Sequence, residues 1–203
     1  MSCKYIIPFL FFIFSSTYSQ DRSFKFSIGV KSGAGSEFKN RNYSFTNAYY
    51  KLEFDYDLIN REKITYSIVF QPEINFGTHQ LLNLYFVKPE EENAAAKREQ
   101  FTQLKDINQY VLNIGFLARK KLYKQLSGFV LISVGPMISD TETERLSKGF
   151  AFSDVLAVGL SYNLHKIRFD ITPSVRHVSN AGLQSSNAGF NTKNIDFGLV
   201  YNL

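Results

Sequence analysis

The chain has 203 residues, a formal net charge of +5 and one cysteine, and 44% of its residues are hydrophobic. So small a positive charge gives no reason to expect a nucleic-acid partner, and one cysteine excludes a disulfide framework. After the N-terminal segment, nothing approaches the roughly 18 consecutive apolar residues that indicate a transmembrane helix. The sequence has no metal-ligand spacing, phosphate loop or dinucleotide motif, so we expect no metal and no cofactor.

The N-terminus has the order of a secretory signal peptide. Lys4 precedes an apolar run over residues 5–14, and a small polar run over residues 15–19 follows it. The apolar run is about half the roughly 20 residues that a membrane-spanning helix needs. We therefore expect a signal peptide over residues 1–19 and one domain over residues 20–203.

The rest of the chain alternates apolar and polar residues, a pattern that predicts β-strands with one apolar face. The clearest case is 50–58, where Tyr50, Leu52 and Phe54 alternate with Lys51 and Glu53. The same alternation marks 24–30, 64–76, 110–116, 130–136, 156–164, 167–179 and 191–203. We therefore predict eight strands.

The predicted connections alternate in length. Short ones lie at 59–63, 121–126 and 163–166, and longer ones at 32–45, 78–105, 139–150 and 180–190. Short turns at one end and long loops at the other are typical of outer-membrane barrels, and about eight strands is their smallest size. Closure also leaves no unpaired sheet edge. The predicted fold is all-β, an eight-stranded antiparallel up-and-down transmembrane β-barrel.

Alternation does not show which face points outward. A soluble lipocalin-like barrel also has about eight strands, but with its apolar face inside. Long strands and the alternating loop lengths favour the membrane barrel. In that arrangement Lys51, Glu53, Asp55 and Asp57 face the lumen, where we expect charges to pair.

Five other residues carry expectations of their own. Pro72, Pro136 and Pro173 fall in predicted strands, where each removes a ladder hydrogen bond, so we expect bulges or strand ends there. His79 and His165 are expected on the surface.

The last hairpin carries a polar cluster on its apolar face. His177 and Ser179 share the parity of Val175, and Asn191 shares the parity of Ile195 on the following strand. A register that pairs residue 177 with residue 191 brings the three polar side chains together, since opposed residues lie about 4.5–5.5 Å apart at Cβ. Histidine beside serine can act as a general base beside a nucleophile.

Segment 177–191, HVSNAGLQSSNAGFN, resembles the signature of lipid A deacylases of the PagL type, which are related to acyloxyacyl hydrolases. The matching pattern is His-x-Ser-Asn-Ala-Gly-Leu, a short polar gap, and Asn-x-Gly. The resemblance implies an eight-stranded barrel in the outer membrane of a Gram-negative bacterium, with its active site on the outer wall at the extracellular leaflet. It also implies a hydrolase that removes an ester-linked 3-hydroxyacyl chain from the lipid A of lipopolysaccharide.

The resemblance implies a role for each matching residue. Ser179 is similar to the family nucleophile and His177 to its general base. Asn180, Gly182 and Asn187 are candidates for an oxyanion hole or for ordering the loop, and the sequence leaves both roles open.

Asn191 departs from the pattern, because it stands where the family has a glutamate that orients the histidine. An asparagine carbonyl can orient an imidazole but cannot offer it a negative charge. Two outcomes therefore remain open: activity with a weaker triad, or a barrel without catalysis that serves envelope integrity or adhesion. A soluble lipid carrier is a third class, and a homodimer is left open. Lys97 and Arg98 of the longest loop are hypothesised to touch lipid A phosphates.

Overall fold

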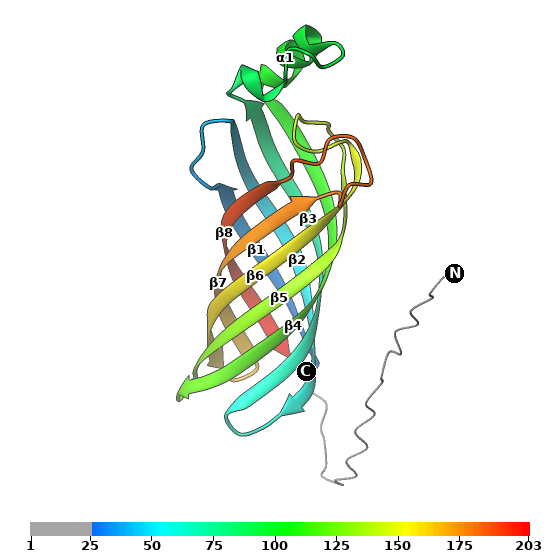
Figure 1. The fold of residues 1–203 in the computed structure, drawn as a ribbon. Coiled ribbons are helices and arrows are strands. Elements are labelled where there is room, and N and C mark those ends of the chain that lie inside the picture. The colour runs from blue at the N-terminus through cyan, green and yellow to red at the C-terminus, as the bar shows by residue number, and fades with distance from the viewer. Residues whose placement is uncertain (1–25) are drawn as a thin grey trace, which may run out of the picture.

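The computed structural model describes residues 26–203, which form one closed barrel of eight antiparallel strands (Figure 1). Each strand pairs with its sequence neighbours, and β1 pairs with β8 to close the ring. The strands are β1 (Phe26–Glu37), β2 (Tyr43–Asn60), β3 (Ile64–Leu81), β4 (Lys105–Tyr123), β5 (Leu126–Ser139), β6 (Gly149–Leu164), β7 (Ile167–Ser179) and β8 (Phe190–Asn202). The predicted fold is confirmed, whereas the predicted signal peptide lies outside the described residues.

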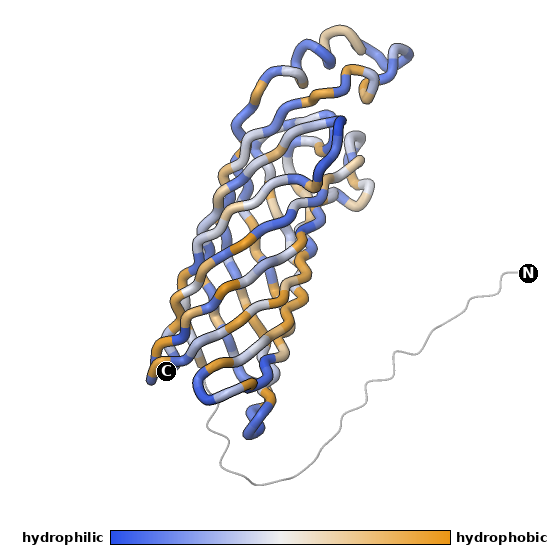
Figure 2. Tube along the Cα trace, turned by 90° about the vertical axis from the view of Figure 1, so that its left-hand side faces the viewer, coloured by the Kyte–Doolittle hydropathy of each residue, from blue (hydrophilic) through white to orange (hydrophobic). Residues whose placement is uncertain are grey.

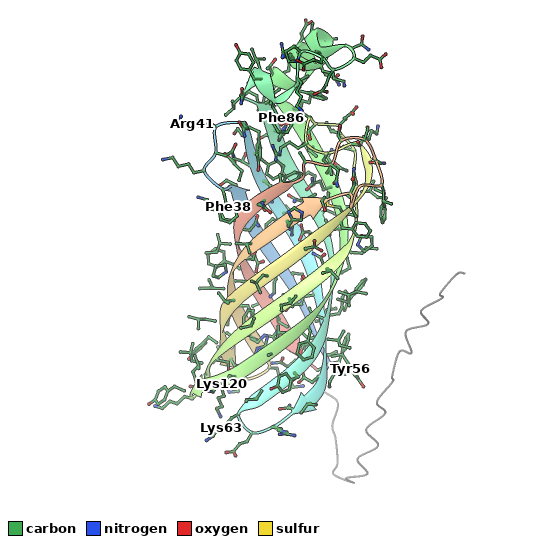
Figure 3. The ribbon with its side chains drawn as sticks, viewed as in Figure 1. Phe38, Arg41, Tyr56, Lys63, Phe86 and Lys120 are labelled. Atoms are coloured by element: carbon green, nitrogen blue, oxygen red, sulfur yellow. The ribbon has the colours of Figure 1, made fainter. Side chains whose placement is uncertain are left out.

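Short turns join the strands at one end of the barrel and longer loops join them at the other. Figure 3 places Lys63 and Lys120 at the short-turn end, and Phe38, Arg41 and Phe86 at the opposite end. The loops at this opposite end cover residues 38–42, 82–104, 140–148 and 180–189. The alternation of connection lengths is therefore as predicted.

Two of these loops differ from the predicted loops 32–45 and 78–105. The first covers only residues 38–42, because β1 and β2 keep their pairing up to Ser36 and Thr46, beyond the predicted strand ends. The loop 82–104 contains a short 3-10 helix η1 (Leu84–Phe86) and helix α1 (Ala94–Thr102), which extends above the barrel (Figure 1).

The apolar stripes of the strands point outward. Val30 and Ile114 are 55% and 57% exposed, while the alternate residue Glu53 is fully buried in the lumen. Figure 2 shows hydrophobic and hydrophilic residues alternating along the strands. An outward apolar band suits a lipid environment, so the lipocalin-like arrangement is wrong for this chain. Separately, no helix in residues 26–203 is long and apolar enough to cross a membrane.

The lumen contains paired charges, as predicted, together with buried apolar side chains such as Phe45 and Leu117. Lys31 Nζ lies 2.8 Å from Glu53 Oε2, and Arg168 Nη2 lies 2.6 Å from Asp55 Oδ2. Further inward contacts join Arg176 to Glu73, Lys51 to Asp196, and Ser67 to Asp57. Buried charges need such partners, because an unpaired charge in a dry interior is strongly destabilising.

The predicted bulges or strand ends at the three prolines are wrong. Pro72, Pro136 and Pro173 lie within strands β3, β5 and β7. Each proline keeps its register with one neighbouring strand, opposite Leu112, Phe152 or Ile195. The ladder to the other neighbouring strand is interrupted and resumes without a register shift. A missing N–H removes a hydrogen bond on one side only, so the strand can continue.

His79 is not a surface residue. It is 2% exposed, its Nε2 lies 2.9 Å from Glu144 Oε2, and its ring stacks on Tyr43 with centroids 5.5 Å apart. His79 lies on the inward face of β3, and the loop 140–148 folds over the barrel mouth and buries it. His165, in the turn between β6 and β7, is exposed as expected.

Candidate active site

The last hairpin brings His177 and Asn191 together on the outer wall. The two residues are directly opposed in the β7–β8 ladder, which is the register that brings the polar residues of the hairpin together. Asn191 Oδ1 lies 2.8 Å from His177 Nδ1, and both side chains are exposed. The next pair, Val178 and Phe190, points inward and is buried, so the hairpin is held from inside the barrel while its polar pair faces outward.

The hydrogen bond to Asn191 sets the tautomer of His177. An amide oxygen only accepts, so Nδ1 must carry the proton and donate it. Nε2 is then unprotonated and can accept a proton from a nucleophile. Ser179 lies two residues along the same outward face and is half-buried. No hydrogen bond joins its Oγ to His177 in the described chain, and catalytic contacts are often long before substrate binds.

The three asparagine and glycine residues proposed from the sequence lie in the loop 180–189, where they bond to one another. The Asn180 amide N–H donates to Asn187 Oδ1 at 2.7 Å, and Gly182 N–H donates to Asn180 Oδ1 at 3.1 Å. Asn180 Nδ2 also donates to Ser186 O at 2.9 Å. Asn180 is fully buried. The geometry therefore makes Asn180 the organising residue of this loop.

Left-handed backbone shapes the same loop. Ala181 and Gly182 both have positive φ, 53° and 78°, and Leu183 N–H bonds back to Asn180 O at 3.0 Å. Two central residues with positive φ define a type I′ turn, which accepts glycine readily. This turn returns the chain toward β8 directly after Ser179.

A second loop braces the hairpin loop from above. Arg145 Nε donates to Gly189 O at 2.6 Å, and Gly189 N–H donates to Arg145 O at 3.0 Å. The Arg145 guanidinium also lies over the Tyr43 ring, 4.6 Å from its centroid. Gly189 abuts the site, because a Cβ built on it would lie 3.4 Å from His177 Cε1 and 3.5 Å from Ser179 Cβ. Arg145 therefore contacts Gly189, which in turn lies beside His177 and Ser179.

A pocket of about 290 Å³ opens beside His177 on the outer wall. Its polar lining includes His177, Asn191 and Asp154, and its apolar lining includes Phe38 and the side chains Ile132, Val134, Leu156 and Val175. A larger pocket of about 950 Å³ contains none of the sequence-predicted site residues, so volume alone does not locate the site. Polar groups at the edge of an apolar hollow suit a ligand with an acyl chain.

Two residues near His177, Asp154 and Arg145, were not predicted from the sequence pattern. Asp154 shares the outward parity of Leu156, so extending the predicted strand 156–164 backwards would have found it. Arg145 carries no periodic signal, because its position depends on the conformation of an irregular loop. In residues 26–203, no group of three His, Cys, Asp or Glu side chains is arranged to hold a metal ion.

The fold and the outward polar cluster together define a small outer-membrane β-barrel protein. The family profile described as Lipid A 3-O-deacylase (PagL) matches residues 24–200. The chain therefore belongs to the PagL family.

Comparison of solved structures supports the fold. The chain is similar to the outer membrane enzyme PagL, with 12% identity and a TM-score of 0.60 over 84% of this chain and 97% of that one. It is also similar to Neisserial surface protein A, with 8% identity and a TM-score of 0.53 over 88% and 97% of the two chains. At these identities the likeness shows the barrel fold alone. The sequence has no match among curated proteins.

Proposed function

We propose that this protein is an outer-membrane lipid A 3-O-deacylase, exported by the signal peptide predicted over residues 1–19. Its reaction is hydrolysis of the ester that joins a 3-hydroxyacyl chain to the glucosamine disaccharide of lipid A. Membership of the PagL family supports the substrate class. The observation that carries the proposal is the bond of 2.8 Å between His177 Nδ1 and Asn191 Oδ1, which leaves Nε2 free to accept a proton beside Ser179.

Ser179 is the proposed nucleophile and His177 the general base. His177 Nε2 takes the Ser179 hydroxyl proton while Oγ attacks the ester carbonyl carbon and forms a tetrahedral intermediate. The imidazolium returns this proton to the departing sugar oxygen as the carbon–oxygen bond breaks, which leaves an acyl-enzyme. Water then attacks the acyl carbonyl, with His177 again as base, and releases the 3-hydroxy fatty acid and free Ser179.

The loop contacts favour different roles for the three residues of 180–189. Asn180 and Gly182 spend their backbone N–H groups within the loop, so we assign them to ordering it. Asn187 is exposed, and its Nδ2 has no hydrogen-bond partner in the described chain although its Oδ1 does. We assign Asn187 Nδ2 as a donor to the oxyanion of the tetrahedral intermediate, the charge that such donors stabilise.

The position of the site suits a lipid substrate. His177 and Ser179 lie at the end of β7 that meets the long loops, and long loops of outer-membrane barrels are extracellular. Apolar Leu156 and Val175 border the pocket below the polar groups. The proposed active site therefore meets the extracellular leaflet, where an acyl chain can remain among apolar side chains while its ester reaches Ser179.

Two observations favour a second candidate, a non-catalytic barrel. Within residues 26–203, Ser179 Oγ has no hydrogen bond to His177, and the orienting partner Asn191 carries no charge. A barrel of this kind would have the same lipid-facing outer wall but would not hydrolyse lipid.

Purified protein in mixed micelles with lipid A distinguishes the two candidates. We expect wild-type protein to release a 3-hydroxy fatty acid, and His177→Ala to lower the rate by about 10²–10⁴-fold, since general-base catalysis supplies about this factor. His165→Ala, an exposed histidine in the β6–β7 turn, is the matched control and should retain the rate. No fatty acid from wild-type protein would favour the non-catalytic barrel.

A further inference from the structure

Asp154 extends the polar pair of the site onto a third strand. It is directly opposed to His177 in the β6–β7 ladder, just as Asn191 is opposed to His177 in the β7–β8 ladder. The three side chains therefore form one row across β6, β7 and β8, with the imidazole in the middle. Directly opposed residues lie about 4.5–5.5 Å apart at Cβ. Asp154 and His177 also line the same pocket.

The surroundings of Asp154 make its carboxylate unusual. Its partner on β5 is Val134, the next outward residue on β6 is Leu156, and both line the pocket. Lumen carboxylates such as Glu53 pair with lysine or arginine, whereas Asp154 has no ion pair or hydrogen bond in the described chain. A charge on the lipid-facing wall of a barrel costs free energy, so an unpaired carboxylate at this position calls for a cation that forms during function.

We propose that Asp154 is a positioning residue that acts through His177, supplying from β6 the negative charge that Asn191 cannot supply from β8. Asn191 holds Nδ1 and sets the tautomer, and Asp154 stabilises the imidazolium that forms when Nε2 takes the Ser179 proton. The two tasks of the acidic member of a catalytic triad are thus divided between two strands. This inference rests on the proposed function.

Other charged groups around His177 do not supply this negative charge. Lys193 is the outward cation of β8, two residues beyond Asn191 and opposed to Val175. Arg176 of β7 points inward and pairs with Glu73, and Arg145 of the loop above bonds to Gly189 O. On the outward faces of β6, β7 and β8, which the structure describes in full, Asp154 is the one carboxylate.

A titration of His177 by NMR tests the proposal without using activity. The chain has three histidines, so the His177 signal in detergent micelles is assigned by its loss in His177→Gln. Unit charges about 6 Å apart at an effective dielectric constant of about 40 change proton affinity roughly tenfold. We therefore expect Asp154→Asn to lower the titration midpoint of His177 by about one pH unit.

Asp106→Asn is the matched control, because Asp106 is an exposed outward carboxylate at the end of β4, remote from the β6–β8 row. In Asp106→Asn, the titration midpoint of His177 should equal that of the wild type. An equal midpoint in Asp154→Asn would overturn the proposal, whether or not the protein deacylates lipid A. Failure of the proposed function is recognised separately, by the absence of fatty acid release from wild-type protein.

A second test measures kcat and its pH profile in Asp154→Asn, and again after a carboxylate is placed at position 191. Asp154→Asn should lower kcat about tenfold with KM within about twofold, and should move the acid limb of the kcat profile to lower pH. Adding Asn191→Glu to this variant returns a carboxylate to the row and should restore both kcat and the acid limb. A loss of kcat with an unmoved acid limb and no restoration would show a merely structural role and overturn the proposal.

Discussion

Replacing Arg145 with alanine should destabilise the loop 180–189 beside the proposed active site while leaving the barrel folded. The change removes the 2.6 Å hydrogen bond from Nε to Gly189 O, and a hydrogen bond to a charged group contributes about 1.5–3 kcal/mol. It also removes the guanidinium from the Tyr43 ring at 4.6 Å, a contact that contributes about 0.5–1 kcal/mol where the cation stays partly exposed to water. The local stability of the loop 180–189 should fall by about 2–4 kcal/mol.

This loss should be visible both in catalysis and in loop dynamics. Since about 1.4 kcal/mol corresponds to a factor of ten, a loss of about 2–4 kcal/mol should slow fatty acid release from lipid A in mixed micelles by about 30-fold to 700-fold. Hydrogen exchange of the Gly189 amide, which donates to Arg145 O at 3.0 Å, should accelerate in the same variant. Lys148→Ala, an exposed cation of the same loop, is the matched control. If Arg145→Ala kept the wild-type rates of Gly189 hydrogen exchange and of fatty acid release, Arg145 would not stabilise the loop 180–189.

Two further predictions concern backbone strain and lumen charge. Gly189→Ala should lower activity at least about tenfold, because φ is +61° and the new Cβ would lie 2.6 Å from Val178 O; a wild-type rate would show that the loop relaxes freely. Glu53→Gln should destabilise the barrel by roughly 3 kcal/mol in urea unfolding from vesicles, because Glu53 is buried with Lys31 at 2.8 Å and Arg168 at 3.3 Å. Glu62→Gln, in an exposed turn, should change this free energy by less than about 0.5 kcal/mol.

The parity of residues in the sequence was enough to predict that His177, Ser179 and Asn191 share the outward face of the last hairpin. Residues two apart in a strand share a face, so His177 and Ser179 had to follow Val175 to the outer wall. The same regularity also carried the position of Asp154. The turn at residues 165–166 pairs Leu164 with Ile167, and counting back along that ladder pairs residue 154 with His177.

Contacts that depend on the conformation of irregular loops could not be predicted from the sequence. His79 lies on the inward face of β3, but its burial requires the loop 140–148 to fold over the barrel mouth and place Glu144 against it. The contact between Arg145 and Gly189 likewise joins two loops that are 44 residues apart in the chain. Such contacts follow from loop conformation, which carries no repeating pattern of polarity.

The most direct test of the central claim is mass spectrometry of lipid A from cells that express the wild-type protein, Ser179→Ala or Ser185→Ala. Ser185 is an exposed serine of the same loop and serves as the matched control. We expect loss of one 3-hydroxyacyl chain with the wild type and with Ser185→Ala, and intact lipid A with Ser179→Ala. Loss of the chain with Ser179→Ala would contradict Ser179 as the nucleophile. Intact lipid A in all three, with the barrel folded in the outer membrane, would contradict the deacylase itself.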